Sequence, residues 1–330
     1  MAGLSREGSR QSGPVARDVA PRDFQWPHGA RCALAVSWDV DVDSMLHLQH
    51  GERAFEQYAT LSYFRYDEVA VPRIVQTCAD LGISSTFFVP GWCIERYRSM
   101  CDVIVAGGHE VAHHGYIHEA PNSQTAEAEL AWLRRASDAI VSLTGKSPAG
   151  WRAPHACPSR YSMDYLVREG FAYDSSLAND HDPFVIEVEG GSLLELPCEV
   201  TMSDWPHYAH VPDFGYLMSP KAPADAIAVF ASELEAAYES GGFLTTIWHP
   251  HVSGRPARLR AWARWVKGLL AQGDIWITTL EEIARHLQGL LDSGRLELRR
   301  VPYPFYNAPV EEIMEFATTY RKLEAPGWPK

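Results

Sequence analysis

The chain has 330 residues, of which 46% are hydrophobic and 11% aromatic, and its formal net charge is -13. This acidic balance argues against a general nucleic-acid-binding surface or an anionic-membrane surface, because both attract an excess of Lys and Arg. No apolar run reaches the about 18 residues of a spanning helix, and residues 1–21 lack the apolar core of a signal peptide. We therefore expect a cytoplasmic globular protein whose six dispersed cysteines are reduced.

Short apolar runs alternate with segments of helical period from residue 31 onward. The runs end at Gly, Pro or charged clusters, as buried parallel strands do. They lie at residues 31–41, 84–91, 109–115, 149–155, 171–177, 193–200, 241–251 and 274–280. Helices are predicted over 66–82, with Asp67 as a cap and Gly82 as a stop, over 123–145, ending at Gly145, and over 223–242 and 257–273. Seven or eight such units match the size of a β/α barrel.

The alternation occupies residues 23–290, which we interpret as one barrel domain. Residues 1–22 are expected to be a flexible segment. Residues 291–330, rich in aromatics and prolines, are expected to pack on the barrel or on a neighbouring subunit. An excursion at residues 42–66 follows the first strand and is a candidate to cover an active site.

Reactive side chains recur at the carboxyl ends of the predicted strands, where barrels of this kind build their active sites. Each feature alone is typical of a cap or a solvated loop. Their repetition at successive strand ends favours a single site. The stretches that carry them are S-W-D-V-D, H-H-G-Y-I-H, R-A-P, D-S-S and W-H-P-H.

A metal site is predicted from two of these stretches. Asp41, His114 and His118 form a two-histidine, one-carboxylate set. Such a set suits Zn²⁺, Fe²⁺ or Co²⁺ and leaves positions open for water and substrate. His113 neighbours His114 on extended backbone and is therefore predicted to face away from the metal.

Two further residues are candidates for proton transfer. Asp39 lies two residues before Asp41, hence on the same side of an extended chain, where it can take a proton from metal-bound water. His249 ends a late strand and is the candidate acid for the leaving group. Together these residues predict metal-assisted hydrolysis in which the leaving group receives a proton.

The motifs resemble, in the same order, those of the polysaccharide deacetylase family, carbohydrate esterase family 4: an acidic pair, H-x-x-x-H, R-x-P, a D-S element and a late strand ending in His. The resemblance covers roughly residues 26–287 and implies an α/β fold, a distorted (β/α)7 TIM-like barrel. The D-x-D spacing and the stretches S-D-W-P-H-Y and H-P-H-V-S-G-R-P-A-R resemble one cytosolic branch. That branch includes peptidoglycan-deacetylase-like enzymes, cyclic imide hydrolases and allantoinase-like ureide hydrolases, often as oligomers.

The resemblance also implies a role for each matching residue. Asp39 is the general base, Arg152 orients it, and His249 protonates the departing nitrogen. The metal ligands that it implies are Asp41, His114 and His118. Zn²⁺ is the expected ion, with Co²⁺, Ni²⁺ and Fe²⁺ as alternatives.

Two positions leave alternatives open. An aspartate that supports His249 is sought in D-S-S-L-A-N-D-H-D, where Asp174 is preferred over Asp180 and Asp182, although Asp174 also fits a strand-end cap. His155 follows R-A-P where many deacetylases have Tyr. That departure puts in doubt the backbone contact to the oxyanion that other members make there.

The motifs do not separate a linear N-acyl group, a cyclic imide and a ureide ring, because each presents an amide carbonyl to the same residues. We expect a small cytosolic amide, such as an N-acyl compound or cyclic imide, and a homo-oligomer, dimer or tetramer. Alternatives are N-deacetylation of peptidoglycan or another amino-sugar polymer, allantoinase-like ureide hydrolysis and, ranked below these, O-acetyl ester hydrolysis or an inactive binding protein. The excursion and four aromatics could close a small pocket, or the aromatics could be core: Trp205, Tyr208, Tyr216 and Trp248. Arg255 fits either an anion-binding residue or a structural salt bridge.

Overall fold

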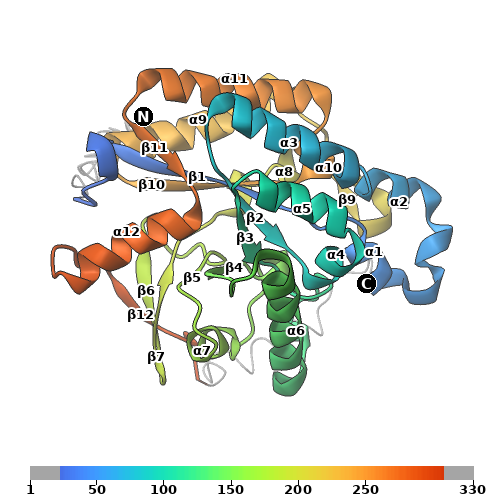
Figure 1. Ribbon diagram of the computed structural model, residues 1–330, viewed down its shortest axis with the longest axis horizontal. Helices are drawn as coiled ribbons and strands as arrows, with labels where there is room; N and C mark the ends of the chain where they lie inside the picture. The colour runs from blue at the N-terminus through green and yellow to red at the C-terminus, as the bar shows by residue number, and fades with distance from the viewer. Residues whose placement is uncertain (1–22, 308–330) are drawn as a thin grey trace, which may run out of the picture.

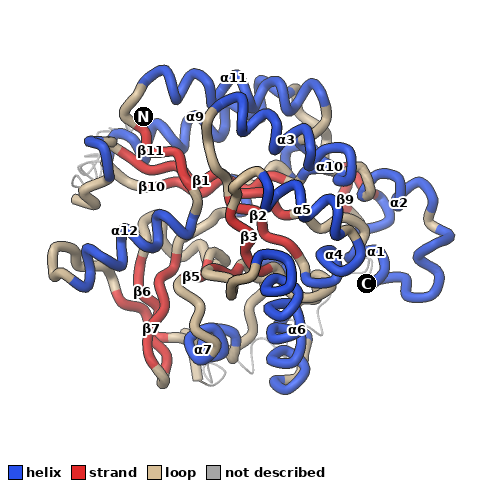
Figure 2. Tube along the Cα trace, in the orientation of Figure 1, coloured by secondary structure: helices blue, strands red, loops and turns tan. Residues whose placement is uncertain are grey.

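The computed structural model describes residues 23–307. Within them, seven parallel strands pair in the order β10-β1-β2-β3-β4-β5-β7. Their bounds are β1 (Cys32–Asp39), β2 (Thr86–Val89), β3 (Glu110–His113), β4 (Gly150–Trp151), β5 (Tyr173–Asp174), β7 (Gly191–Glu195) and β10 (Phe243–Trp248). Figure 2 shows β1, β2 and β3 near the centre, with β7 at the lower left edge. This mainly parallel architecture confirms the predicted α/β fold class.

The barrel is distorted between β7 and β10. Among the described residues these two strands do not pair with each other. The segment that connects them contacts β10 through one isolated parallel bridge, between Ser203 and Ile247. β11 (Ile275–Thr278) pairs with the first half of β1. β6 (Phe184–Val188), which the sequence analysis did not single out, pairs antiparallel with β7.

Helices follow the strands and cover the sheet from outside (Figure 1). The longer ones are α3 (Asp67–Leu81), α5 (Arg98–Ala106), α6 (Ala126–Thr144), α7 (Ser162–Arg168), α9 (Pro223–Ser240), α11 (Pro256–Gln272) and α12 (Leu280–Asp292). Four of them confirm the four predicted helices. α3 and α6 end at Gly82 and Gly145, whose φ angles of 70° and 77° are left-handed and favour glycine.

The alternation of side chains along β1 explains how this strand serves both the core and the site. Leu34, Val36 and Trp38 pack into the large cluster beneath the outer helices. Ala33 and Ala35 belong to the cluster on the other face. Because side chains alternate along a strand, Ser37 and Asp39 continue this second face toward the carboxyl end. The strand thus delivers Asp39 to the end of the sheet that carries the other polar residues.

The excursion after β1 is helical. It contains α1 (Ser44–His50), the 3-10 helix η2 (Gly51–Glu56) and α2 (Tyr58–Phe64). Met45 and Phe64 pack with Val211, beside Trp205 and Tyr216. These partners lie in the segment that precedes α9: η5 (Val200–Met202), α8 (Trp205–Tyr208), β8 (His210–Val211), η6 (Pro212–Phe214) and β9 (Tyr216–Leu217). The remaining short helices are η1 (Pro27–Gly29), α4 (Gly91–Arg96), η3 (Pro121–Ser123), η4 (Pro154–Ala156) and α10 (Pro250–Ser253).

Part of the predicted C-terminal extension joins the sheet. β12 (Arg300–Pro302) pairs parallel with β6. Residues 308–330, and the predicted flexible segment 1–22, lie outside the described residues. All six cysteines are free thiols, as expected. In the described part of the chain, no helix has the length and apolar character to cross a membrane.

Candidate active site

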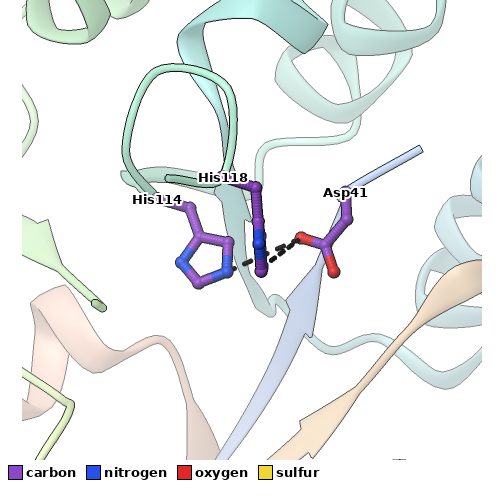
Figure 3. A group of neighbouring side chains, drawn as sticks. All are labelled: Asp41, His114 and His118. Atoms are coloured by element: carbon purple, nitrogen blue, oxygen red, sulfur yellow. Dashed lines mark ion pairs between the residues drawn. The ribbon is translucent and has the colours of Figure 1, made fainter. Parts of the chain in front are cut away.

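Three predicted ligands converge where β1 and β3 end. The Nε2 atoms of His114 and His118 each lie 3.6 Å from Asp41 Oδ1. One candidate ligand atom from each residue can be chosen so that all lie within 4.8 Å of one another. Figure 3 shows the two imidazoles and the carboxylate facing a common point. All three side chains are buried, so the group is preorganised inside the protein.

The loop between the two histidines holds their orientation. His114 Nδ1 lies 2.8 Å from the Arg152 carbonyl oxygen, to which it donates, so its Nε2 lone pair is left for a metal. The buried Glu119 carboxylate accepts hydrogen bonds from the backbone N–H groups of Tyr116 and Ile117. A Cβ at Gly115, where φ is 70°, would lie 2.8 Å from Pro154. Only glycine therefore fits the turn that brings the second histidine back toward the first.

The residues of this group fit a divalent cation. Asp41 Oδ1 is buried, and no group in residues 23–307 hydrogen-bonds to it. Burial has the largest effect on the pKa of Asp41 and raises it to about 6, against the opposing effect of His114 and His249. Burial, and then His114, hold the pKa of His118 well below its ordinary value, so this imidazole is neutral, as a ligand must be. A cation among the three would supply the partner that Asp41 lacks.

Asp39 lies beside the group formed by Asp41, His114 and His118, and Arg152 holds its carboxylate. Arg152 donates from Nη1 to Asp39 Oδ1 at 2.7 Å and to Ser37 Oγ at 2.8 Å. Its Nε and Nη2 donate to the carbonyl and hydroxyl oxygens of Ser175. Burial alone would raise the pKa of Asp39, but the Arg152 guanidinium and nearby imidazoles outweigh it and hold the pKa below its ordinary value. Asp39 is thus ionised, with Oδ2 3.9 Å from His114 Nε2.

His249 reaches the same site from β10, and its partner is Asp204. His249 Nδ1 lies 2.7 Å from Asp204 Oδ1, and its backbone N–H donates to Oδ2 of the same carboxylate at 3.0 Å. Ser253 Oγ also donates to Asp204 Oδ2. His249 Nε2 faces the three predicted metal ligands and lies 3.8 Å from Asp41 Oδ2. Asp204 therefore fixes the ring so that Nε2 points inward.

The prediction that Asp174 supports His249 is wrong. Asp174 Oδ1 accepts a hydrogen bond from Ser176 Oγ at 2.6 Å, and the carboxylate lies beside the buried Glu195. Burial raises the pKa of Asp174, and burial together with the Asp174 charge raises the pKa of Glu195 well above its ordinary value. The raised pKa of Glu195 favours a neutral carboxyl group beside Asp174, behind the wall of the site. Asp174 faces Glu195 because β5 sets it opposite that residue in β7.

The pKa of His249 reflects its acidic surroundings. Burial, the largest single influence, would lower it. The carboxylates of Asp204, Asp41 and Asp39 together outweigh burial and raise the pKa to about 9. The imidazole is therefore protonated at neutral pH in the protein without a metal. A cation bound to Asp41 would offset part of this negative charge and bring the pKa down.

The two remaining histidines of the motif region take different positions. His113 faces away, as predicted: its Nε2 lies 3.0 Å from the Leu133 carbonyl oxygen, and its Nδ1 accepts the Gly115 N–H. His155 has a left-handed backbone with φ 59° and ψ 13°, and its ring centroid lies 4.4 Å from that of His118. It therefore stands at the edge of the site rather than in the core.

A pocket of about 470 Å³ opens above these groups. Its floor carries Asp39, Asp41, His114, His118 and His249. Its walls are mainly apolar: Met45, Ala153, Ala156, Leu177, Ala178, Cys198, Val200, Trp205, Tyr216 and Ile247. The excursion supplies Met45 to this wall, in agreement with its expected position over the site. Of the four aromatics considered, Trp205 and Tyr216 line the pocket, while Tyr208 and Trp248 are buried in core clusters.

Arg255 does not line this pocket. Its Nε donates to the His251 carbonyl oxygen, and its guanidinium lies 4.1 Å from the centre of the Tyr66 ring. These contacts are structural ones.

The sequence analysis missed two residues of the site. Asp204 lies in S-D-W-P-H-Y, a stretch that was quoted for its resemblance but given no role. Ser37, which accepts a hydrogen bond from Arg152, precedes Asp39 by two positions on the same face of β1. That spacing was the signal that could have identified Ser37. No regular spacing links Asp204 to His249.

Comparison with known proteins gives relatives of one kind. The family model for polysaccharide deacetylase matches residues 58–173. A peptidoglycan deacetylase of Helicobacter pylori is 33% identical over 176 residues, which cover 52% of this chain and 59% of that protein. A peptidoglycan deacetylase-like protein of Gibberella zeae is 31% identical over 170 residues, covering 50% and 49%. The chain thus spans about half to three fifths of the length of these curated relatives.

Solved structures extend the match to most of the chain. A Mycobacterium smegmatis protein assigned as a polysaccharide deacetylase is 34% identical, with a TM-score of 0.79 over 86% of this chain and 96% of that one. PuuE allantoinase is 22% identical, with a TM-score of 0.72 over 84% and 96%, and shares the fold. Because the identity to the first structure extends over nearly its whole length, the chain belongs to the polysaccharide deacetylase family.

Proposed function

We propose that this protein is a metal-dependent hydrolase of a non-peptide carbon-nitrogen bond in a small amide. The observation that carries the proposal is the convergence of Asp41, His114 and His118 on the floor of a pocket that also holds Asp39 and His249. Family membership supports hydrolysis of an N-acyl group. Zn²⁺ is the ion proposed, with Co²⁺, Ni²⁺ and Fe²⁺ as alternatives, because the donor set is two imidazoles and a carboxylate.

Each residue has a distinct part in the proposed reaction. When bound, the divalent cation polarises the amide carbonyl and lowers the pKa of water. Asp39, ionised and held by Arg152, accepts the proton of the attacking water. His249, protonated and oriented by Asp204, donates a proton from Nε2 to the departing nitrogen. An amide nitrogen needs that proton because the unprotonated amine anion is a poor leaving group.

The pocket supports a compact substrate with an apolar body. Its volume of about 470 Å³ suits a small molecule. Of the two wall serines, Ser176 is fully engaged, since its Oγ donates to Asp174 and accepts from Ala153 N–H, while Ser203 Oγ accepts from Trp205 N–H and can still donate. A sugar ring needs several polar partners for its hydroxyl groups, and these walls offer few. We therefore favour an N-acyl compound or a cyclic imide.

A second candidate is N-deacetylation of peptidoglycan or another amino-sugar polymer. The names of the two curated relatives favour it. Because this chain spans only part of each relative, their activity is carried here as a candidate. The fold likeness to an allantoinase keeps ureides among the substrates to test.

A direct assay separates these candidates. The protein, loaded with Zn²⁺ or Co²⁺, is incubated with succinimide-type imides, simple N-acyl amines, allantoin-like ureides, N-acetylated sugars and peptidoglycan fragments, with O-acetyl esters for comparison. We expect the highest kcat/KM on an imide or N-acyl amine, abolished by Asp39→Asn. Highest kcat/KM on peptidoglycan fragments would replace the small-amide proposal with the second candidate. No hydrolysis of any substrate by the metal-loaded protein would contradict both.

We also propose a cytoplasmic homo-oligomer, dimer or tetramer. Two aromatic side chains of the excursion support an interface there, since Phe55 and Tyr58 are 62% and 77% exposed. Light scattering would give the subunit number. Phe55→Ser with Tyr58→Ser should lower it, and a monomeric wild-type protein would contradict the proposal.

A further inference from the structure

A buried pair outside the pocket links the two halves of the site. Asp67 and His251 are both fully buried, and His251 Nδ1 lies 3.1 Å from Asp67 Oδ1. Asp67 is the first residue of α3, where the helix dipole favours a carboxylate. The sequence suggests it as the cap of this helix, but the N-cap position belongs to Tyr66, and the Asp67 carboxylate contacts Val42 and His251. Its contacts go to the active-site segments instead.

The other oxygen of Asp67 holds the backbone directly after a metal ligand. Asp67 Oδ2 accepts the N–H of Val42 at 2.9 Å. Val42 has φ 45°, which is costly for a β-branched residue because its side chain crowds the backbone. On the other side of the same peptide group, the Asp41 carbonyl oxygen accepts from Cys93 Sγ at 3.1 Å. The peptide that carries Asp41 is thus fixed at both its oxygen and its nitrogen.

His251 connects Asp67 to the segment that carries His249. It lies two residues after His249, in α10. Its ring packs edge-on against Phe64, with the ring centroids 5.0 Å apart. A Cβ at Gly254 would lie 2.4 Å from the Ala70 Cβ, so α10 and α3 approach too closely for any larger residue. The start of α3 and the end of β10 are therefore fixed in position relative to each other.

We propose that Asp67 and His251 are positioning residues for the metal centre: they hold the strained Val42 peptide and thereby aim the Asp41 carboxylate at the two histidines. The inference rests on the proposed function, because it assumes that Asp41 binds a metal. Neither residue lines the pocket, and the His251 ring packs behind Trp205 and His249, with ring centroids 5.7 and 5.8 Å away. Loss of the pair should therefore act through the geometry of the metal centre.

Co²⁺ binding tests the proposal without reliance on turnover. Its affinity is measured by competition with a chelator, and its visible absorption spectrum reports the geometry of the ligands. We expect Asp67→Ala and His251→Leu to weaken Co²⁺ binding by about 10- to 100-fold, as loss of partners that orient metal ligands does, and to change the spectrum. Asp67→Asn keeps an oxygen for the Val42 N–H and should restore most of the affinity.

Glu110→Ala is the matched control. Glu110 is also a buried carboxylate that accepts a backbone N–H, from Glu281, but it lies at the opposite end of β3 from the ligands. Glu110→Ala should lower the melting temperature while leaving the Co²⁺ affinity and the absorption spectrum unchanged. If Asp67→Ala does not fold, His251→Leu and Asp67→Asn provide the comparison.

Two results would overturn the inference. The first is wild-type Co²⁺ affinity and spectrum in folded Asp67→Ala or His251→Leu protein. The second is an equal loss of affinity in Glu110→Ala, which would indicate general destabilisation. Failure of the wild-type protein itself to bind Co²⁺ would refute the metal site, and with it both the proposed function and this inference.

Discussion

The two halves of the site are built in different ways. On the ligand side, Asp39, Asp41, His114 and Arg152 lie at or after the ends of β1, β3 and β4, which belong to one sheet and run parallel. On the acid side, His249 ends β10, but Asp204 comes from the irregular segment that fills the gap between β7 and β10. Strand ends bring side chains together in a way that sequence spacing reveals. A partner on an irregular segment has no such spacing, which is why Asp204 was missed.

The largest effect is expected from Asp39→Asn on the ligand side. The amide cannot accept a proton, so kcat should fall by about 10²- to 10⁴-fold, the contribution of a positioned base. Metal content, measured by elemental analysis, should stay the same because Asp39 is not one of the three converging ligands. Substantial retained turnover would contradict the assignment of Asp39 as the base.

The next effect is expected from Asp204→Asn on the acid side. The change removes the charge that holds the pKa of His249 up, so kcat should fall by about 10²-fold, at the lower end of what a positioned acid contributes. Since His249 acts protonated, activity is lost as pH rises through its pKa, and this alkaline limb should move to lower pH. The pH dependence of kcat measures both. An unmoved limb would argue against His249 as the acid.

The same variant should change the stability of the metal-free protein. The pKa of His249 rises from 6.5 to about 9 on folding. Its protonated ring therefore contributes stability that is fully present below pH 6.5 and is lost as pH rises through about 9. Asp204→Asn should remove this slope from a plot of unfolding free energy against pH between 7 and 9. The slope in Asp174→Asn serves as the comparison.

A smaller effect is expected from pH on metal-induced stabilisation. The pKa of Asp41 rises from 3.8 to about 6 on folding, so a proton on Asp41 stabilises the metal-free fold at low pH, and this contribution is lost as pH rises through about 6. The metal competes with that proton. At 100 times its Kd, Zn²⁺ should stabilise the protein by about 2.7 kcal/mol. Calorimetry at fixed total Zn²⁺ should show a larger shift in melting temperature at pH 7 than at pH 5, and equal shifts would contradict Asp41 as a ligand.

The smallest effect is expected from Asp174→Asn. Asp174 lies opposite Glu195, and the partner of His249 Nδ1 is Asp204. The amide oxygen can still accept the hydrogen bond from Ser176 Oγ, so the alkaline limb of kcat should stay where it is in the wild-type protein. A limb shifted as far as in Asp204→Asn would restore Asp174 as the supporting residue.

Much of the fold was predictable because strand ends and helix stops have local causes. The apolar runs marked the parallel strands, and Gly82 and Gly145 marked the ends of two helices. β6 was missed because its pairing with β7 depends on a hairpin at the barrel's distorted side. Asp67 was interpreted as a helix cap because a carboxylate at a helix start is typical there. Its long-range partners, Val42 and His251, were not visible in the local sequence.

The most direct test of the account is the metal content of the wild-type protein beside His114→Ala, after both are loaded with Zn²⁺ and dialysed. Elemental analysis should give one Zn²⁺ per wild-type chain and a loss of stoichiometric metal in the variant, because His114 supplies one of three converging ligand atoms. Circular dichroism would confirm that the variant is folded. Equal metal content in the two proteins would contradict the proposed metal centre.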